Sequence, residues 1–140
     1  MDSFVNTELA PPPVGPYPHA RKVGQLLFLS GVGPRKPGQK EIPGVSLDAQ
    51  GHITDYDITA QCHSVFQNVK VILEAAGARW EDLVDVTVFL TNMQDDFKTF
   101  NQIYREYFPD AATQPCRTTV EVNALPTPIA IELKCVAALS

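Results

Sequence analysis

The sequence predicts a single α+β domain in which two helices cover one face of a mixed sheet, in the order β-β-α-β-α-β-β. Three observations predict this fold class. The chain of 140 residues fits one domain, and 44% of it is apolar, which is enough to bury a core. Two segments show helical spacing of apolar residues, while others alternate with the period of a strand. The 12 prolines gather in residues 11–18, 34–43 and 109–128, which favours loops there.

The first half of the chain predicts two short strands and a helix. Residues 20–23 and 26–29 read as an antiparallel pair around the turn signal Gly24-Gln25. Residues 57–76 predict a helix, because their apolar side chains recur at three and four positions. Thr54 followed by Asp57 resembles a capping pattern, and Gly77 suits a left-handed stop.

The second half predicts a strand, a helix and two more strands. Apolar and polar residues alternate over 84–90, and a second amphipathic helix is expected from 95 to 107. Strands at 117–122 and 129–138 flank a turn-rich stretch, so we expect them to pair as a hairpin. Because both helices then cover one face of the sheet, the other face is expected to find a partner chain, which predicts a homo-oligomer.

Composition restricts the partners and the compartment. The formal net charge of −5 disfavours binding of nucleic acid. The sequence contains no run of about 18 consecutive apolar residues, so no membrane span is expected. Three widely spaced cysteines, an odd number, argue against a disulfide framework and favour a reducing cytoplasm. Cys62 and His63 are consecutive on the expected helix and point about 100° apart, so they cannot chelate one ion easily and no metal is expected. No Walker loop and no Gly-x-Gly-x-x-Gly fingerprint is present, and no cofactor is expected.

Arg117 and Glu132 are the candidate catalytic pair. If Val122 faces Ile129 in the expected hairpin, Thr119 lies opposite Glu132, and Arg117 and Glu132 become diagonal neighbours on one face. Arginine offers a planar fork for a carboxylate, and a glutamate can hold and polarise a water molecule. The alternative, which the pattern alone favours, is a cross-strand ion pair on a solvated face.

Two further features are candidate parts of a binding site. Tyr17 lies in a stiff proline-rich segment, which holds the phenol either over a pocket or as a plug at the rim of the fold. Ser30-Gly31 follows an expected strand, and glycine lets the backbone approach a ligand closely.

Six motifs in order resemble the RidA (YjgF) family over residues 13–140. They are Gly15-Pro16-Tyr17, Leu29-Ser30-Gly31, the helix end Glu74-Ala75-Ala76-Gly77, Val86-Thr87-Val88-Phe89-Leu90, Pro115-Cys116-Arg117 and Ile131-Glu132. The resemblance implies a chorismate-mutase-like fold, a homotrimer with sites at its subunit interfaces, and deamination of 2-imino or 2-enamino acids. The family's carboxylate-binding arginine matches Arg117, its water-orienting glutamate Glu132, and its pocket tyrosine Tyr17. Many relatives carry cysteine where this chain has Thr119. The segment 34–56 is longer than the corresponding segment in the short members of the family.

The segments 51–55 and 133–138 look most like the 2-aminomuconate deaminase branch of that family. This resemblance implies hydrolysis of 2-aminomuconate to 4-oxalocrotonate and ammonia during the catabolism of aromatic compounds. Arg117 would then grip one carboxylate, while backbone around Gly31 and Cys116 binds the nitrogen; Ser30 and Thr119 complete the expected substrate contacts. Candidates for the second carboxylate stay open by loop position: His19, Arg21, Arg35, Lys36 and Asn92.

Three other functions stay open at this point. One is a RidA-type imine deaminase of broad specificity. Another is a ribonuclease that inhibits translation, and the third is a binding trimer without catalysis.

Overall fold

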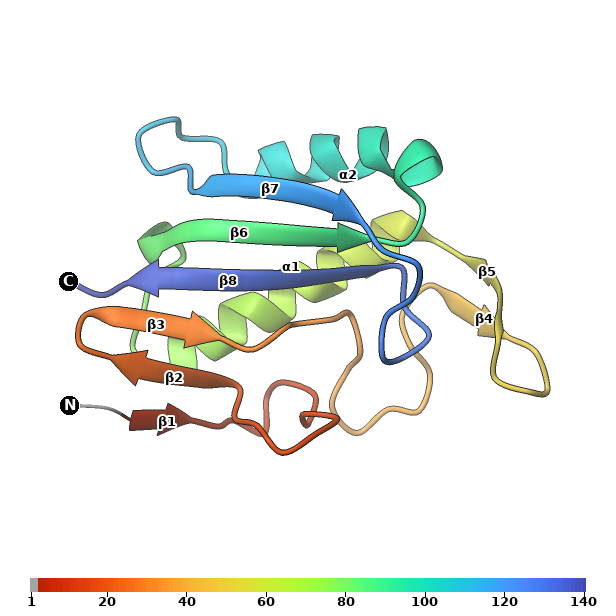
Figure 1. The fold of residues 1–140 in the computed structure, drawn as a ribbon, viewed down its shortest axis with the longest axis horizontal. Helices are drawn as coiled ribbons and strands as arrows, with labels where there is room; N and C mark the ends of the chain where they lie inside the picture. The colour runs from red at the N-terminus through yellow and green to blue at the C-terminus, as the bar shows by residue number, and fades with distance from the viewer. Residues whose placement is uncertain (1–2) are drawn as a thin grey trace.

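The structure is a computed structural model that describes residues 3–140. Figure 1 shows a long sheet with helices behind it and a small separate hairpin at one end. The elements are β1 (Ser3–Val5), β2 (Ala20–Val23), β3 (Leu26–Leu29), β4 (Val45–Leu47), β5 (Ile53–Tyr56), α1 (Ile58–Ala75), a 3₁₀ turn (Trp80–Asp82), β6 (Leu83–Leu90), α2 (Met93–Tyr107), β7 (Cys116–Glu121) and β8 (Ile131–Ala138).

The main sheet has six strands in the order β1-β2-β3-β8-β6-β7. Strands β6 and β7 run parallel, and every other neighbouring pair is antiparallel, so the sheet is mixed. The expected pairing of residues 20–23 with 26–29 is confirmed. Helix α2 forms the crossover between β6 and β7, which is the usual way to connect parallel neighbours.

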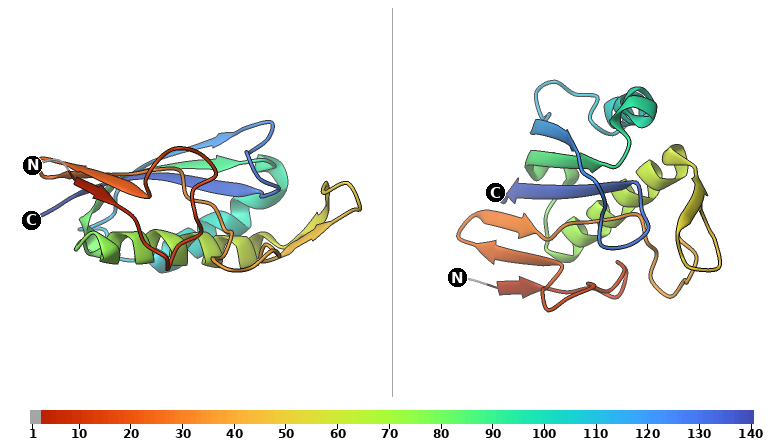
Figure 2. Two further views of the ribbon diagram at one scale, coloured as in Figure 1. Left: turned by 90° about the horizontal axis from the view of Figure 1, so that it is seen from below. Right: turned by 45° about the vertical axis from the view of Figure 1, so that its right-hand side comes forward.

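Both helices lie on one face of this sheet, as the sequence predicts (Figure 2). The core between the two layers is apolar. It includes Val65, Phe66, Val69 and Leu73 from α1, Phe100 and Ile103 from α2, and Val86, Val88, Leu133 and Cys135 from the sheet. Burial of this single stripe on each helix provides the main drive for the fold.

The expected hairpin of the last two strands is wrong. Strand β6 lies between β7 and β8 and pairs with both of them. Val122, which was expected to face Ile129, instead donates its N–H to the carbonyl of Leu90 on β6 at 2.8 Å. The reason is topological: the α2 crossover carries β7 to the outside of β6, and β8 then fills the gap between β6 and β3.

Arg117 and Glu132 therefore lie on opposite faces of the sheet within one chain, which corrects the expected diagonal pair. Arg117 is level with Val86, a buried residue of the helix-covered face. Glu132 is level with Phe89, whose side chain belongs to the other face because faces alternate along a strand.

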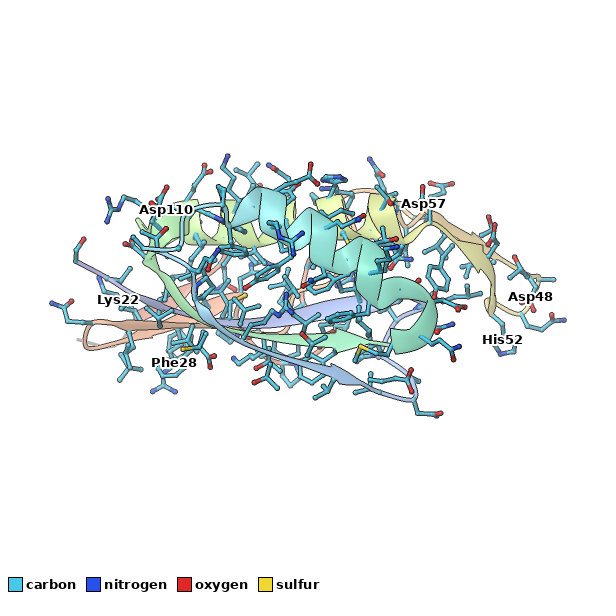
Figure 3. The ribbon with its side chains drawn as sticks, turned by 90° about the horizontal axis from the view of Figure 1, so that it is seen from above. Lys22, Phe28, Asp48, His52, Asp57 and Asp110 are labelled. Atoms are coloured by element: carbon cyan, nitrogen blue, oxygen red, sulfur yellow. The ribbon has the colours of Figure 1, made fainter. Side chains whose placement is uncertain are left out.

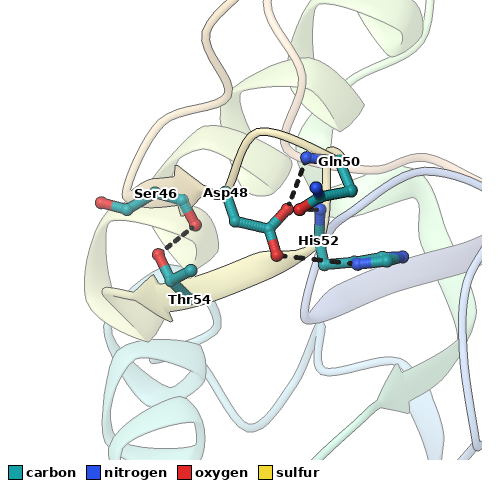
Figure 4. Close-up of polar contacts among 5 residues, drawn as sticks. All are labelled: Ser46, Asp48, Gln50, His52 and Thr54. Atoms are coloured by element: carbon teal, nitrogen blue, oxygen red, sulfur yellow. Dashed lines mark hydrogen bonds and ion pairs between the residues drawn. The ribbon is translucent and has the colours of Figure 1, made fainter.

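Three local features were not expected from the sequence. Strand β1 adds an edge next to β2, and β4 and β5 form a hairpin that projects from the body. The turn of this hairpin is closed by Asp48, which accepts from the backbone N–H groups of Gln50 and His52 at 2.9 Å each (Figure 4).

The N-cap of α1 is Asp57 alone, because the hydroxyl of Thr54 donates to the carbonyl of Ser46. Gly77 has the left-handed φ of 78° that was expected after α1.

The face of the sheet that lacks helices exposes large apolar side chains. Figure 3 shows Phe28 on the side of the sheet opposite to the helices. Phe28 is level with Arg21, and Arg21 with Phe4, so these residues share that face. Phe4 is 64% exposed, and Leu26 and Val23 are 41% and 40% exposed. An exposed apolar patch of this kind is typical of an interaction surface.

Over residues 3–140, no helix is long and apolar enough to cross a membrane.

Candidate functional site

Gly31 and Glu132 form the centre of the candidate site. Beyond the end of β3, Val32 and Leu133 exchange two backbone hydrogen bonds of 2.8 Å in an antiparallel bridge, so Gly31 and Glu132 are diagonal neighbours on the same face. A Cβ atom at position 31 would lie 2.6 Å from Oε2 of Glu132. Glycine at this position therefore makes room for the carboxylate, for a steric reason that the sequence alone did not show.

Glu132 lies at the wall of a hollow that Tyr17 and Gly31 also line. The other lining residues are Val14, Gly33, Arg35, Pro126, Thr127 and Ile129. A second, adjoining hollow is lined by Tyr17, Ser30 and Gly31 together with Pro18 and His19. The structure thus brings together four of the expected site residues: Tyr17, Ser30, Gly31 and Glu132.

Hydrogen bonds hold the segment that carries Tyr17. The Ser30 hydroxyl donates to the carbonyl of Pro18 at 2.7 Å, so Ser30 positions the neighbour of Tyr17. The buried ring of His19 accepts from the N–H of Thr7 at Nδ1, which leaves the proton on Nε2 to be donated to the carbonyl of Pro11 at 2.8 Å. These three hydrogen bonds fix the backbone before and after Tyr17.

The carboxyl of Glu132 is half-buried, and this burial raises its pKa above the usual value for glutamate. Within the described chain, no cationic side chain forms an ion pair with it. Lys134 lies two residues away on the same face, but its ammonium donates to the carbonyl of Leu29. A carboxyl with a raised pKa and free acceptor oxygens is suited to exchange a proton with a water molecule or a substrate.

Arg117 is held under β7 by residues of α2. Its guanidinium donates to Oδ1 of Asn101 at 2.8 Å. It also lies over aromatic rings, 4.6 Å from the ring centroid of Tyr104 and 5.5 Å from that of Phe100. The geometry is favourable for cation–π attraction, so the side chain has a defined position at the edge of the sheet.

The other expected site residues also lie outside the hollow that contains Glu132. Cys116 is exposed on β7. Thr119 lies on the face of Arg117, level with Val88, and its buried hydroxyl has no hydrogen-bond partner among the described residues. Asn92 is the N-cap of α2, where its side chain accepts from the N–H of Asp95. In one chain, therefore, the expected site residues lie in two separate places.

Sequence reasoning missed the residues that support the hollow. Asn68 and Ser64, on α1, donate side-chain hydrogen bonds to the backbone carbonyls of residues 33–35. Their only signal was the presence of polar residues on an otherwise apolar helical stripe. Arg35 was a candidate by loop position, and the structure puts it in the hollow with Glu132.

Over residues 3–140, no three His, Cys, Asp or Glu side chains gather in a way that could hold a metal ion. The expectation of a reaction without metal or cofactor stays a prediction.

Comparison with known proteins gives one consistent family. Residues 7–139 match the family model described as Endoribonuclease L-PSP. A RutC family protein of Pyrococcus horikoshii is 39% identical over 98% of this chain and 98% of its own length. The chloroplastic Reactive Intermediate Deaminase A of Arabidopsis thaliana is 38% identical over 96% of this chain, which spans 65% of that protein.

Solved structures give the same answer. Escherichia coli TdcF with bound serine superposes with a TM-score of 0.83 at 32% identity, covering 99% of each chain. The Escherichia coli YjgF gene product superposes with a TM-score of 0.81 at 34% identity, covering 97% of this chain and 98% of its own.

Proposed function

This chain belongs to the Endoribonuclease L-PSP (RidA/YjgF) family, and we propose that it is a deaminase of broad specificity that hydrolyses 2-imino and 2-enamino acids. Relatives named reactive intermediate deaminase support this activity. The observation that carries the proposal is the half-buried Glu132 carboxyl, which has a raised pKa, lacks an ion-pair partner within the described residues, and faces the bare Cα of Gly31.

The proposed reaction needs one base and one carboxylate clamp. An enamine substrate first tautomerises to the imine, and the imine nitrogen is protonated before attack. Glu132 then accepts a proton from a water molecule as the water oxygen bonds to the imine carbon and the C=N π electrons move to the iminium nitrogen. Glu132 returns this proton to the amino nitrogen of the carbinolamine, the C–N bond breaks, and ammonia leaves as the carbonyl forms. Loss of the remaining hydroxyl proton completes a 2-oxo acid. Tyr17 and the backbone at Gly31 restrict the position of the substrate over Glu132.

We propose that Arg117 of a second copy supplies the clamp in a homotrimer. Arg117 and Glu132 cannot meet within one chain, because they lie on opposite faces of the sheet and are separated by β6. The apolar face with Phe28 and Leu26 supports association, since such a surface is more stable when covered. In this arrangement Cys116, Thr119 and Asn92 would join the site from the neighbouring copy.

A narrower proposal is that 2-aminomuconate is the substrate and 4-oxalocrotonate the product, in the catabolism of aromatic compounds. Its support is the sequence likeness of residues 51–55 and 133–138 to that branch. In the structure, the first of these segments lies at the turn of the β4–β5 hairpin and the second is most of β8. We propose a cytoplasmic location as well, supported by three cysteines that are all unpaired.

Ammonia release from freshly generated 2-imino acids tests the proposed activity. The purified protein should accelerate this release over the spontaneous hydrolysis, and Glu132→Gln should lose most of the acceleration. The same preparations, given 2-aminomuconate, test the narrower proposal. Cleavage of single-stranded RNA with Glu132-independent kinetics, in the absence of ammonia release, would support the ribonuclease alternative instead. Saturable substrate binding with neither activity would indicate a binding trimer.

A further inference from the structure

Arg35 shares the hollow that contains Glu132 and Tyr17. Among the lining residues, Arg35 is the cationic one in the described part of the chain. Two glycines, Gly31 and Gly33, also line the hollow and present no side chains to it. A ligand that reaches Glu132 therefore enters a hollow that is also lined by one permanently charged cation, Arg35.

The backbone of Arg35 is held from below by α1. Asn68, which is 1% exposed, donates to the carbonyls of Gly33 and Arg35 at 2.8 and 2.6 Å. Ser64 donates to the intervening carbonyl of Pro34 at 2.6 Å. Three consecutive carbonyls are thus fixed by two buried polar side chains of a rigid helix. Such support is typical of residues whose position matters for binding.

The guanidinium of Arg35 keeps donors available. One nitrogen donates to the carbonyl of Pro12 at 2.8 Å, which steadies the side chain against the segment that carries Tyr17. No carboxylate within residues 3–140 forms an ion pair with Arg35. Since a guanidinium has five N–H groups, most of its hydrogen-bonding capacity remains for an anion.

We propose that Arg35 determines specificity by binding a second anionic group, remote from the reacting carbon, so that the site prefers 2-imino dicarboxylates to monocarboxylates. This inference rests on the proposed deaminase function. A second carboxylate in this hollow would be repelled by Glu132, and the adjacent guanidinium of Arg35 offsets that repulsion. A monocarboxylate with an apolar tail makes no use of this charge.

Binding of two matched 2-oxo acids, measured by calorimetry, tests the inference on the intact protein. The probes are 2-oxoglutarate and 2-oxopentanoate, which have the same number of carbons and differ in whether the far end is a carboxylate or a methyl group. The wild-type protein should bind 2-oxoglutarate roughly 10- to 100-fold more tightly, the range of one charge-assisted contact. Arg35→Gln should abolish this preference and leave 2-oxopentanoate affinity within about twofold. Arg35→Lys should recover part of it, because the charge is kept and the planar fork is lost.

Lys40→Gln provides the matched control, since it removes one positive charge from the same loop at an exposed position outside the hollow. This variant should keep the wild-type preference. Equal affinity for the two acids in the wild-type protein, or binding of neither, overturns the inference. A preference that survives in Arg35→Gln also overturns it, as does an equal loss for both acids, which would assign Arg35 to support of the Pro12 segment. Ammonia release from a monocarboxylate imine is measured in parallel, so that failure of the deaminase proposal is seen separately.

Discussion

The region around Glu132 and the region around Arg117 differ in how far one chain completes them. Hydrogen bonds from Ser30, His19 and the helix α1 fix the walls around Glu132. Arg117 is also well held, by Asn101 and aromatic rings, but it stands on β7 at the edge of the sheet. The difference teaches that precise placement of a side chain and completion of a site are separate properties. Both Glu132 and Arg117 line hollows within one chain, but these are two separate hollows, and the proposed reaction needs both residues in one site.

Removing the planar fork at Arg117 should have the largest effect. Arg117→Lys keeps the charge but loses bidentate carboxylate binding, so kcat/KM for ammonia release should fall roughly 100-fold or more, about 3 kcal/mol of transition-state stabilisation. Steady-state kinetics on a 2-imino acid measures this. If Arg117 only stabilised the edge strand, the variant would lose about 1 kcal/mol of folding stability or less and keep its turnover.

Glu132→Gln should lower kcat by roughly 100-fold while ligand affinity changes little, because the amide keeps the shape of the side chain but cannot accept the proton. Calorimetry with 2-oxopentanoate provides the affinity, and ammonia release provides kcat. Near-normal turnover of the folded variant would remove Glu132 from the mechanism. The two variants together show whether the two regions serve different steps.

A mixture of the two variants should recover activity if the two regions come from different chains. If each site takes Glu132 from one copy and Arg117 from its neighbour, a one-to-one mixture of Arg117→Lys and Glu132→Gln chains rebuilds about a quarter of the sites at random assembly. After partial unfolding and refolding together, activity should therefore rise from near background to about a quarter of the wild-type value. Sites formed within single chains would show no recovery in the mixture.

Gly31→Ala should disturb the Glu132 region alone. The new methyl group would lie 2.6 Å from Oε2 of Glu132 and push the carboxylate aside. We expect kcat to fall about 10-fold or more, since a 1 Å misplacement of a catalytic group can cost on the order of 100-fold, with little change in thermal stability because Gly31 is exposed. Gly24→Ala serves as the control for a glycine far from the hollow; it tests the loss of a left-handed turn without contact to Glu132. Equal kinetic losses in both variants would argue against the steric explanation.

The pH dependence should show the smallest effect, a displacement of the acidic limb of kcat/KM. Burial raises the pKa of Glu132, so the ionised base is lost at a higher pH than for an ordinary glutamate as pH falls. The same shift has a stability counterpart. A raised pKa in the folded state makes stability decline as pH rises from the ordinary glutamate pKa to the raised one. Glu132→Gln should therefore match the wild-type Tm at low pH and exceed it slightly at neutral pH. An acidic limb at the ordinary glutamate pKa would contradict this.

The sequence predicted where the helices and strands lie better than it predicted which strands pair with each other. Helical spacing located α1 and α2, and alternation located β6, because both periods arise within one segment. Pairing of β7 depends on the α2 crossover, and a hairpin with β8 looked equally compatible with the turn at Pro126. The polar composition of β7, with Arg117, Thr118 and Glu121, was the available signal that this strand lies at an edge rather than in the middle of the sheet.

The candidate site was predictable residue by residue but not as an assembly. Tyr17, Ser30, Gly31 and Glu132 gather as the motifs suggested. The opposite orientation of Arg117 could not be derived, because a change of strand neighbour also changes which residues share a face. Arg35 remained one of several loop cations until the bonds from Asn68 and Ser64 fixed its place.

The three cysteines give the chain a built-in single-site chemical label. Burial raises the thiol pKa of both Cys62 and Cys135 to about 12, so neither forms an appreciable thiolate at neutral pH. Cys116 is exposed and lies next to Arg117 on the edge strand. A thiol-reactive fluorophore should thus attach to one position per chain without mutagenesis. If Cys116 joins a site between two copies, as proposed, association should slow this labelling, so its rate would report whether the β7 edge is covered.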